Sequence, residues 1–247
     1  VHIGQSLASI YRTHMVKRLE SSFFAFKKSL HTLRRITEDM IKMFDEDKVI
    51  IAPELNIKDL QFKGMDLDEI MEYIINKGYS KEDFLYSKED FEPVFYDMLQ
   101  NDFVVLNSLC TEWDNINEDP KLDKFSENLD RFISSDINPE NKLVIFSESV
   151  DTVNYLYKFL TEQQHRTDVL CVAASNRSKW FETIKANFDA NVPESEQKDD
   201  YSIIVTSDVL AEGVNLHRSN VIVNYDSPWN ASRLMQRIGR VNRIGSV

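Results

Sequence analysis

The 247-residue sequence contains only two cysteines and no long apolar run. Cys110 and Cys171 lie far apart without the spacing of metal ligands, so we expect reduced thiols in a cytoplasmic protein. No stretch of about 18 apolar residues occurs, and no membrane-spanning helix is expected. The first residues lack the charged and apolar regions of a secretory signal. With 42% hydrophobic and 28% charged residues, the composition is that of an ordinary globular protein.

Motifs that would bind a nucleotide without help are also missing. The chain has no Gly-x-x-x-x-Gly-Lys-Ser/Thr and no Asp-Glu-x-His, so the loop that cradles phosphates and the acids that hold Mg²⁺ are absent. By itself, the chain is therefore not expected to hydrolyse ATP or to bind a metal. No Gly-x-Gly-x-x-Gly follows a predicted strand, which disfavours a doubly wound domain for a small-molecule ligand.

The net charge of −12 is unevenly distributed along the chain. Residues 1–35 carry seven Lys/Arg and one acid (+6), residues 36–140 carry ten and 27 (−17), and residues 141–247 carry 12 and 13 (−1). The total argues against a nucleic-acid partner, because proteins that bind nucleic acid usually present a basic face. However, the acidity belongs to the middle segment alone. After Asp226 the sequence has four arginines and no acid, which makes a local cationic strip.

The N-terminal part of the sequence has the periodicity of amphipathic helices. No Gly or Pro occurs between Gln5 and Ala52, where apolar residues recur every three or four positions. We expect one long helix or two in line, with a candidate break at Ser21-Ser22, because serine competes for backbone hydrogen bonds. Three further helices are predicted, from about Asp66 to the stop signal Asn76-Lys77-Gly78, over 88–115 with Pro93 in the first turn, and over 121–135.

From residue 141 onward the pattern changes to short apolar runs that alternate with helical periodicity. Strands are predicted at 142–146, 169–172, 201–205 and 221–225. Helices are predicted at 150–160, 178–189 and 230–241, and a polar loop at 190–200. This alternation is typical of βαβ units and a parallel sheet. The sequence therefore predicts an all-helical segment followed by an α/β domain.

Polar and cationic residues follow the last two predicted strands. In an open parallel sheet, ligands bind beyond the carboxyl ends of the strands. Segment 206–216 follows the third strand, and a helix with Arg233, Arg237 and Arg240 on one face follows the fourth. Arg243 continues that stripe. Guanidinium groups without acids nearby in sequence require an anionic partner, which is either nucleotide or nucleic-acid phosphate or acids elsewhere in the chain.

Four segments, in this order, resemble motifs of superfamily 2 helicases. Lys142–Ser149 (KLVIFSES) is similar to motif IV, and Ile203–Leu216 (IIVTSDVLAEGVNL) is similar to motif V. Tyr225–Asn230 (YDSPWN) resembles the Asp-x-x-Trp-Asn element that Swi/Snf-like proteins carry before motif VI. Gln236–Gly245 (QRIGRVNRIG) resembles motif VI with the Arg-Ile-Gly tail of that branch. The resemblance implies a RecA-like parallel sheet flanked by helices, the second motor lobe, over 141–247.

The resemblance also implies roles for individual residues. The two motif VI arginines that reach the nucleotide phosphates correspond to Arg240 and Arg243, which would act as arginine fingers. The residues expected near the nucleotide are Gln236, Glu212, Gly213 and Asn215. The residues expected to contact nucleic-acid phosphate are Ser147, Thr206 and Ser207. Trp229 fits core packing at least as well as a functional role, because most of its surface is apolar.

The first residues resemble a different part of such proteins. Lys17–Ser22 is similar to the interlobe segment of the bacterial RNA-polymerase-associated helicase-like branch. We therefore expect an interlobe connector helix over 1–35, an acidic helical insertion over 36–140 and the motor lobe over 141–247. The start without Met and the end just after motif VI indicate a fragment whose first lobe lies outside this sequence. The stretch 173–177 departs from the Asp-Gly turn of many relatives, so it receives no role in nucleic-acid binding.

These features imply the second lobe of an ATP-dependent nucleic-acid translocase or helicase. Double-stranded DNA is favoured as the substrate by the Swi/Snf-like features. ATP and Mg²⁺ would be cofactors of the full-length protein, in which the first motor lobe of the same polypeptide would be a partner. The alternative is a non-enzymatic, motor-like regulatory module that binds a protein partner through residues 36–140. A first lobe without the phosphate-loop lysine would favour that alternative.

Overall fold

The computed structural model describes residues 2–52, 55, 65, 67–134, 136–210 and 214–241, and side chains from residue 10 onward. The chain forms two compact units. We call residues 1–26 together with 118–247 the sheet unit, and residues 27–117 the acidic unit. These divisions differ from the sequence-based boundaries at 35/36 and 140/141, because residues 118–140 group with the sheet.

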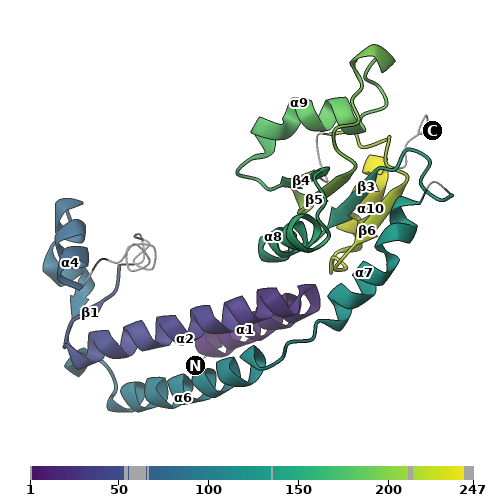
Figure 1. Cartoon of the computed structure of the whole chain (residues 1–247). Coiled ribbons are helices and arrows are strands. Elements are labelled where there is room, and N and C mark those ends of the chain that lie inside the picture. Colours follow the sequence, from purple (N-terminus) through teal and green to yellow (C-terminus); the bar gives the residue numbers. More distant parts are fainter. Residues whose placement is uncertain are drawn as a thin grey trace. The chain divides into compact units, whose positions relative to one another are not determined.

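The sheet unit is built on four parallel strands, shown in Figure 1. These strands are β3 (Leu143–Phe146), β4 (Val169–Val172), β5 (Ile203–Thr206) and β6 (Val221–Asn224). Their order is β4-β5-β3-β6, and Leu143 of β3 lies opposite Ile203 on one side and Val221 on the other. The predicted α/β class with a parallel sheet is confirmed. All four strands end at one edge of the sheet, where the polar segments of motifs IV and V begin.

Helices cover both faces of this sheet, and the strand residues alternate between them. Leu143 and Ile145 pack with α7 (Pro120–Ile133) and α8 (Val150–Lys158), which continues as a π-helical turn, Phe159–Gln163. Val144 and Phe146 pack in the cluster that contains α9 (Arg177–Phe188) and the last residue of α10 (Ala231–Val241). These helices and strands match the predicted ones to within a few residues. The core thus fixes the strands and the end of α10 in place.

The N-terminal helix of the sheet unit ends at the predicted serine pair. α1 (His2–Ser21) stops there, and α2 (Phe23–Asp45) begins after Ser22, whose hydroxyl accepts a hydrogen bond from the Ala25 amide at 3.0 Å. Lys121 of α7 donates its ammonium to the carbonyl oxygens of Glu20 (2.6 Å) and Ser21 (2.9 Å). A lysine at a helix C-terminus satisfies carbonyl groups that have no partner within the helix. Of the two alternatives, one long helix or two, the structure has two, and the break lies at the candidate pair Ser21-Ser22.

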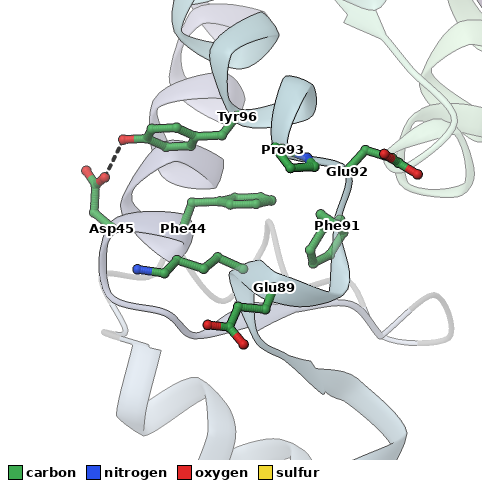
Figure 2. A pocket seen from close by; sticks show the side chains of 8 residues that line it. Phe44, Asp45, Glu89, Phe91, Glu92, Pro93 and Tyr96 are labelled. Carbon is green, nitrogen blue, oxygen red and sulfur yellow. Dashed lines mark hydrogen bonds between the residues drawn. The ribbon is translucent and has the colours of Figure 1, made fainter.

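The acidic unit is mainly helical. Besides α2 from Lys27 onward, it contains α4 (Leu67–Asn76), the single turn α5 (Lys81–Phe84) and α6 (Pro93–Asp114). Its core includes Phe44, Ile70, Ile74 and Phe84, and Phe44 lies beside Phe91 and Tyr96 in Figure 2. Two short strands, β1 (Val49–Ile50) and β2 (Leu85–Tyr86), form an antiparallel pair that the helical prediction did not contain.

Two predicted turn signals in this unit have the expected geometry. Gly78 adopts a φ of 97°, the left-handed conformation that favours glycine, directly after α4. Pro93 is the first residue of α6, where its missing amide hydrogen costs nothing. Among the described residues, no helix is both long and apolar enough to cross a bilayer.

Candidate functional site

The helix that carries the motif VI resemblance is anchored by a buried arginine. Arg237 of α10 is 0% exposed. Its Nε donates to Asp208 Oδ1 at 2.6 Å, and its Nη1 donates to Asn224 Oδ1 at 3.0 Å and to the Asp226 carbonyl at 3.3 Å. Its guanidinium carbon lies 5.2 Å from the ring centroid of Phe146. Because an unpaired buried cation costs several kcal/mol, these contacts fix α10 against the ends of β3, β5 and β6.

A second arginine of α10 is paired with acids of the same unit. Arg233 Nη1 lies 3.3 Å from Asp208 Oδ2 and 3.5 Å from Glu148 Oε1, and its side chain is 53% exposed. Of the two alternatives that the sequence left open for the arginine face, pairing with acids elsewhere in the chain holds for Arg233 and Arg237. Acids that are distant in sequence lie beside them, because β3 and β5 end where α10 begins.

Gln236 and Arg240 are the other described residues of α10 to which the resemblance assigns a role near the nucleotide. Gln236 is exposed, whereas Arg240 is half-buried. The Arg240 carbonyl accepts the Leu216 amide at 3.0 Å, which joins the last turn of α10 to the end of motif V. The predicted site residues Arg243, Glu212 and Gly213 lie outside the described residues.

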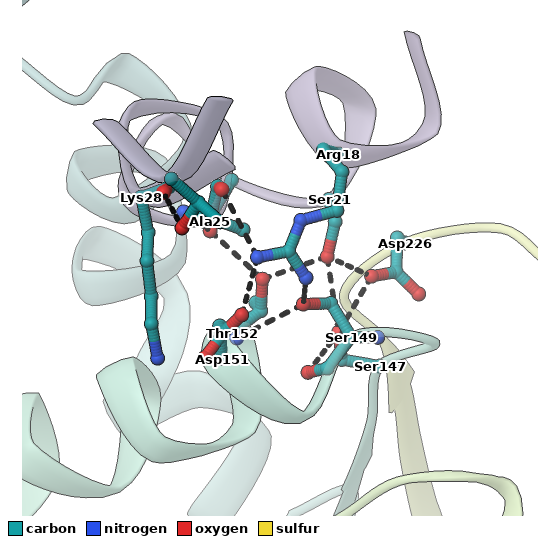
Figure 3. Close-up of polar contacts among 11 residues, drawn as sticks. Arg18, Ser21, Ala25, Lys28, Ser147, Ser149, Asp151, Thr152 and Asp226 are labelled. Atoms are coloured by element: carbon teal, nitrogen blue, oxygen red, sulfur yellow. Dashed lines mark hydrogen bonds and ion pairs between the residues drawn. The ribbon is translucent and has the colours of Figure 1, made fainter. Parts of the chain in front are cut away.

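A network of hydroxyl groups surrounds the carboxylate of Asp226, as Figure 3 shows. Asp226 Oδ2 accepts hydrogen bonds from Ser147 Oγ at 2.6 Å and from Ser21 Oγ at 2.5 Å, and its Oδ1 accepts from the Glu148 amide at 2.7 Å. Ser21 Oγ also lies 2.7 Å from Thr152 Oγ1. A buried carboxylate with several donors is well satisfied. The network holds the end of α1 against the motif IV turn.

The three residues predicted to contact nucleic-acid phosphate differ in how far they are exposed. Ser147 is 0% exposed and donates to Asp226, and Thr206 is 0% exposed and donates to the Val172 carbonyl at 2.9 Å. Neither hydroxyl is at the surface in this conformation, since each sits at a strand end covered by its neighbours. Ser207, the next residue after Thr206, is partly exposed. Of the three predicted residues, Ser207 is the one that is partly exposed, and its contact with a phosphate stays a prediction.

Asn215 lies at the other end of motif V. It is half-buried, and its Nδ2 donates to Asp189 Oδ2 at 3.4 Å. This contact joins the motif V loop to the end of α9. The structure thus gives Asn215 a packing partner within the sheet unit, and its predicted position near a nucleotide stays a prediction.

A pocket of about 250 Å³ lies between α1 and the loops after β3 and β6. Trp229 is 55% exposed at this pocket, so core packing does not explain it. Its Nε1 donates to Glu20 Oε2 at 2.8 Å, and Lys17 Nζ lies 4.7 Å from its ring centroid. Arg18 donates to Ser149 Oγ at 2.7 Å and pairs with Asp151. The pocket therefore combines cations and an accessible indole, although sequence reasoning singled out none of these cations as a site residue.

The surroundings of Lys121, which lies beside this network, shift the pKa of its amine. Burial lowers the pKa of Lys121, while the nearby carboxylates of Asp226, Asp119 and Glu20 oppose that shift. Its Nζ lies 4.4 Å from the Tyr225 ring centroid. Across the described residues, no cluster of three or more His, Cys, Asp or Glu side chains is arranged to hold a metal ion.

The chain is similar in sequence to known helicases. A model of the helicase conserved C-terminal domain matches residues 121–245, half of the 247-residue chain. The chain is 32% identical over 108 residues to the ATP-dependent helicase YqhH of Bacillus subtilis, covering 43% of this chain and 17% of that protein. It is 25% identical over 237 residues to the ATP-dependent RNA helicase SUB2 of Debaryomyces hansenii, covering 88% and 48%. The chain thus spans less than half the length of either relative.

One solved structure also aligns with the chain. It is the C-terminal part of the Fun30 ATPase domain, with a TM-score of 0.42 and 19% sequence identity, and the alignment covers 63% of this chain and 54% of that one.

Proposed function

Since the chain belongs to the family of helicase conserved C-terminal domains, we propose that it is the second motor lobe of an ATP-dependent, Swi/Snf-like translocase that acts on double-stranded DNA. The observation that carries this proposal is the anchoring of α10. Arg237 Nε and Nη1 bind Asp208, Asn224 and the Asp226 carbonyl, and these contacts hold α10, which also carries Gln236 and Arg240, beside the strand ends. Such preorganisation is what stabilisation of a charged transition state requires.

Within this proposal, the phosphates of ATP are met by side chains of α10. Arg240 and Arg243 are the arginine fingers, because a guanidinium can donate two parallel hydrogen bonds to a phosphate. Gln236, Glu212, Gly213 and Asn215 form the surrounding nucleotide surface. ATP supplies the phosphoryl group whose transfer drives the motor. Mg²⁺ is assigned to residues of the first motor lobe, because the Asp-Glu-x-His motif that holds it does not occur in this sequence.

The nucleic-acid contact is assigned to the strand-end loops. Ser207 is the proposed phosphate ligand, since Ser147 and Thr206 are buried in this conformation and would need a local rearrangement. Double-stranded DNA is proposed because the Asp-x-x-Trp-Asn element and the Arg-Ile-Gly tail resemble the Swi/Snf-like branch. A cytoplasmic location is proposed from the two free thiols, Cys110 and Cys171.

The test measures ATP turnover of the full-length gene product with duplex DNA and with RNA. We expect DNA to stimulate turnover, and we expect Arg240→Ala to reduce it by roughly 10³-fold, the usual effect of losing an arginine finger. Arg233→Ala is the matched control, because that arginine lies on the same helix and is engaged by Asp208 and Glu148. It should lower turnover by less than about fivefold.

Two outcomes would contradict parts of this proposal. Normal turnover in Arg240→Ala would remove the arginine-finger assignment, and stimulation by RNA alone would remove the assignment to DNA. If the wild-type full-length protein has no ATPase activity under any nucleic-acid condition, the regulatory module that binds a protein through its acidic segment becomes the better account.

A further inference from the structure

The acidic unit contains a pocket of about 570 Å³ that the proposed motor function does not use. It lies where the end of α2 meets the start of α6, and rings form much of its wall (Figure 2). The ring centroids of Phe44 and Phe91 are 5.0 Å apart with their planes at 61°, and those of Phe44 and Tyr96 are 5.7 Å apart. Pro93 completes the apolar wall. This volume is within the range of pockets that bind organic ligands, roughly 300–1,000 Å³.

The polar lining of this pocket is mostly acidic. Three carboxylates line it, those of Asp45, Glu89 and Glu92, against the single cation Lys88, which gives a local charge of −2. Asp45 accepts a hydrogen bond from the Tyr96 hydroxyl, which raises the pKa of that phenol. The C-terminus of α2 and the N-terminus of α6 both lie at this pocket, and their helix dipoles have opposite signs there and offset each other. The sign of the potential in the pocket is therefore set by its charged side chains. The surrounding unit agrees in sign, since residues 27–117 carry 11 Lys/Arg and 20 Asp/Glu, a net charge of −9.

Aromatic faces and carboxylates in one pocket together favour a cationic ligand. The face of an aromatic ring attracts a cation placed within about 6 Å of its centroid, and a carboxylate adds a direct ion pair. An anion would face the same three carboxylates with only Lys88 to offset them. A neutral apolar ligand would gain nothing from them. The wall of this pocket therefore favours a group that is cationic at its tip and apolar along its stem, as lysine and arginine side chains are.

We propose that this pocket is a docking site for a basic peptide segment of a partner protein, which inserts a lysine or arginine side chain between the rings and the carboxylates. The volume exceeds that of one such side chain, so neighbouring residues of the segment fill the remainder. The negative charge of the acidic unit would attract the segment from a distance and speed its association. The site is independent of the ATPase assignment, since none of its residues belongs to the sheet unit.

The test uses the whole 247-residue chain and a fluorescein-labelled dodecapeptide of alternating lysine, arginine and leucine. Fluorescence anisotropy at physiological salt measures the Kd, and the reference probe is the same peptide with glutamate in place of every cation. We expect binding of the basic peptide and none of the acidic one. The double variant Glu89→Gln/Glu92→Gln should weaken binding by about tenfold or more.

Three further variants separate docking from general attraction to an acidic protein. Asp102→Asn/Glu112→Gln removes two exposed carboxylates of α6 outside the pocket and should change the Kd by less than about twofold. Phe91→Leu keeps an apolar wall but removes a π face, and should weaken binding by roughly three- to tenfold. Lys88→Ala should tighten binding, because it removes the repelling cation.

Three results would overturn the proposal. One is no binding of the basic peptide. A second is an equal loss in the pocket and control double variants, which would indicate only non-specific attraction. A third is an unchanged or weakened Kd in Lys88→Ala. Circular dichroism of each variant checks that the helices remain folded, and the surface variants Glu89→Gln and Lys88→Ala keep the test decisive if Phe91→Leu unfolds.

Discussion

The two units differ in whether some of their ion pairs are buried or exposed. In the sheet unit, some charged groups are buried and paired, as Arg237 is with Asp208 and as Asp226 is with three donors. In the acidic unit, charges lie at the surface, and ion pairs such as Lys48–Asp68 join exposed side chains. Burial makes a pair rigid and costly to break, whereas exposure leaves it available to a partner. Buried ion pairs therefore hold the loops and helices of the sheet unit in place, whereas the exposed charges of the acidic unit remain available to bind a partner.

The largest stability effect is expected from Arg237→Leu. This change leaves Asn224 without its guanidinium partner and Asp208 with only the exposed Arg233, and should lower the free energy of unfolding of the sheet unit by about 3 kcal/mol or more. Trp180 and Trp229 belong to the sheet unit and Trp113 to the acidic unit, so urea unfolding followed by fluorescence in a Trp113→Phe background reports the sheet unit. Arg233→Ala, on the same helix, should cost less than about 1 kcal/mol. Equal losses in both variants would mean that burial does not distinguish these arginines.

An intermediate effect is expected from Asp226→Asn. The substitution keeps the shape of the side chain but removes the charge that accepts from Ser21, Ser147 and the Glu148 amide. Hydrogen bonds to charged groups are worth about 1.5–3 kcal/mol, so a loss of about 2 kcal/mol is expected in the same fluorescence assay. Ser227→Ala, at the exposed next residue, should be close to neutral. A neutral Asp226→Asn would show that the hydroxyl network does not hold α1.

The smallest effect is expected from Asp68→Ala in the acidic unit. Lys48 Nζ lies 2.7 Å from Asp68 Oδ1, but the Asp68 side chain is 72% exposed. Solvent screens such pairs, and the expected loss is about 0.5 kcal/mol or less. Fluorescence of Trp113 in a Trp180→Phe/Trp229→Phe background measures it. A loss above about 2 kcal/mol would break the proposed contrast between the two units.

The sequence predicted the elements of the sheet unit well because its signals are local. Short apolar runs of strand length and the Arg-rich helix lie within a few residues of where they were expected. The helix break at Ser21-Ser22 and the stop at Gly78 were also predicted, since each depends on the backbone preference of one or two residues. The pair β1 and β2 was missed because two-residue strands carry no periodicity.

The site was harder to predict because its contacts join distant parts of the chain. Arg237 and Asp208 are 29 positions apart, and Ser21 and Asp226 are 205 positions apart. Sequence spacing alone therefore left open whether the arginine face pairs with phosphate or with acids elsewhere in the chain. The same lack of three-dimensional information made Ser147 and Thr206 look available to phosphate, although strand ends bury both of them. The aromatic pocket could have been suspected only from the density of rings and acids around Phe91.

The contact between Ser21 and Asp226 also sets an order of events during synthesis. The sheet unit is discontinuous, with the whole acidic unit inserted between its first 26 residues and the rest. Asp226 leaves the ribosome long after residues 27–117, so α1 cannot acquire its hydroxyl contacts until the inserted unit has been made in full. Contacts of such long sequence separation form late and slowly. The acidic unit can therefore fold before its host, and α1 is the segment that must wait.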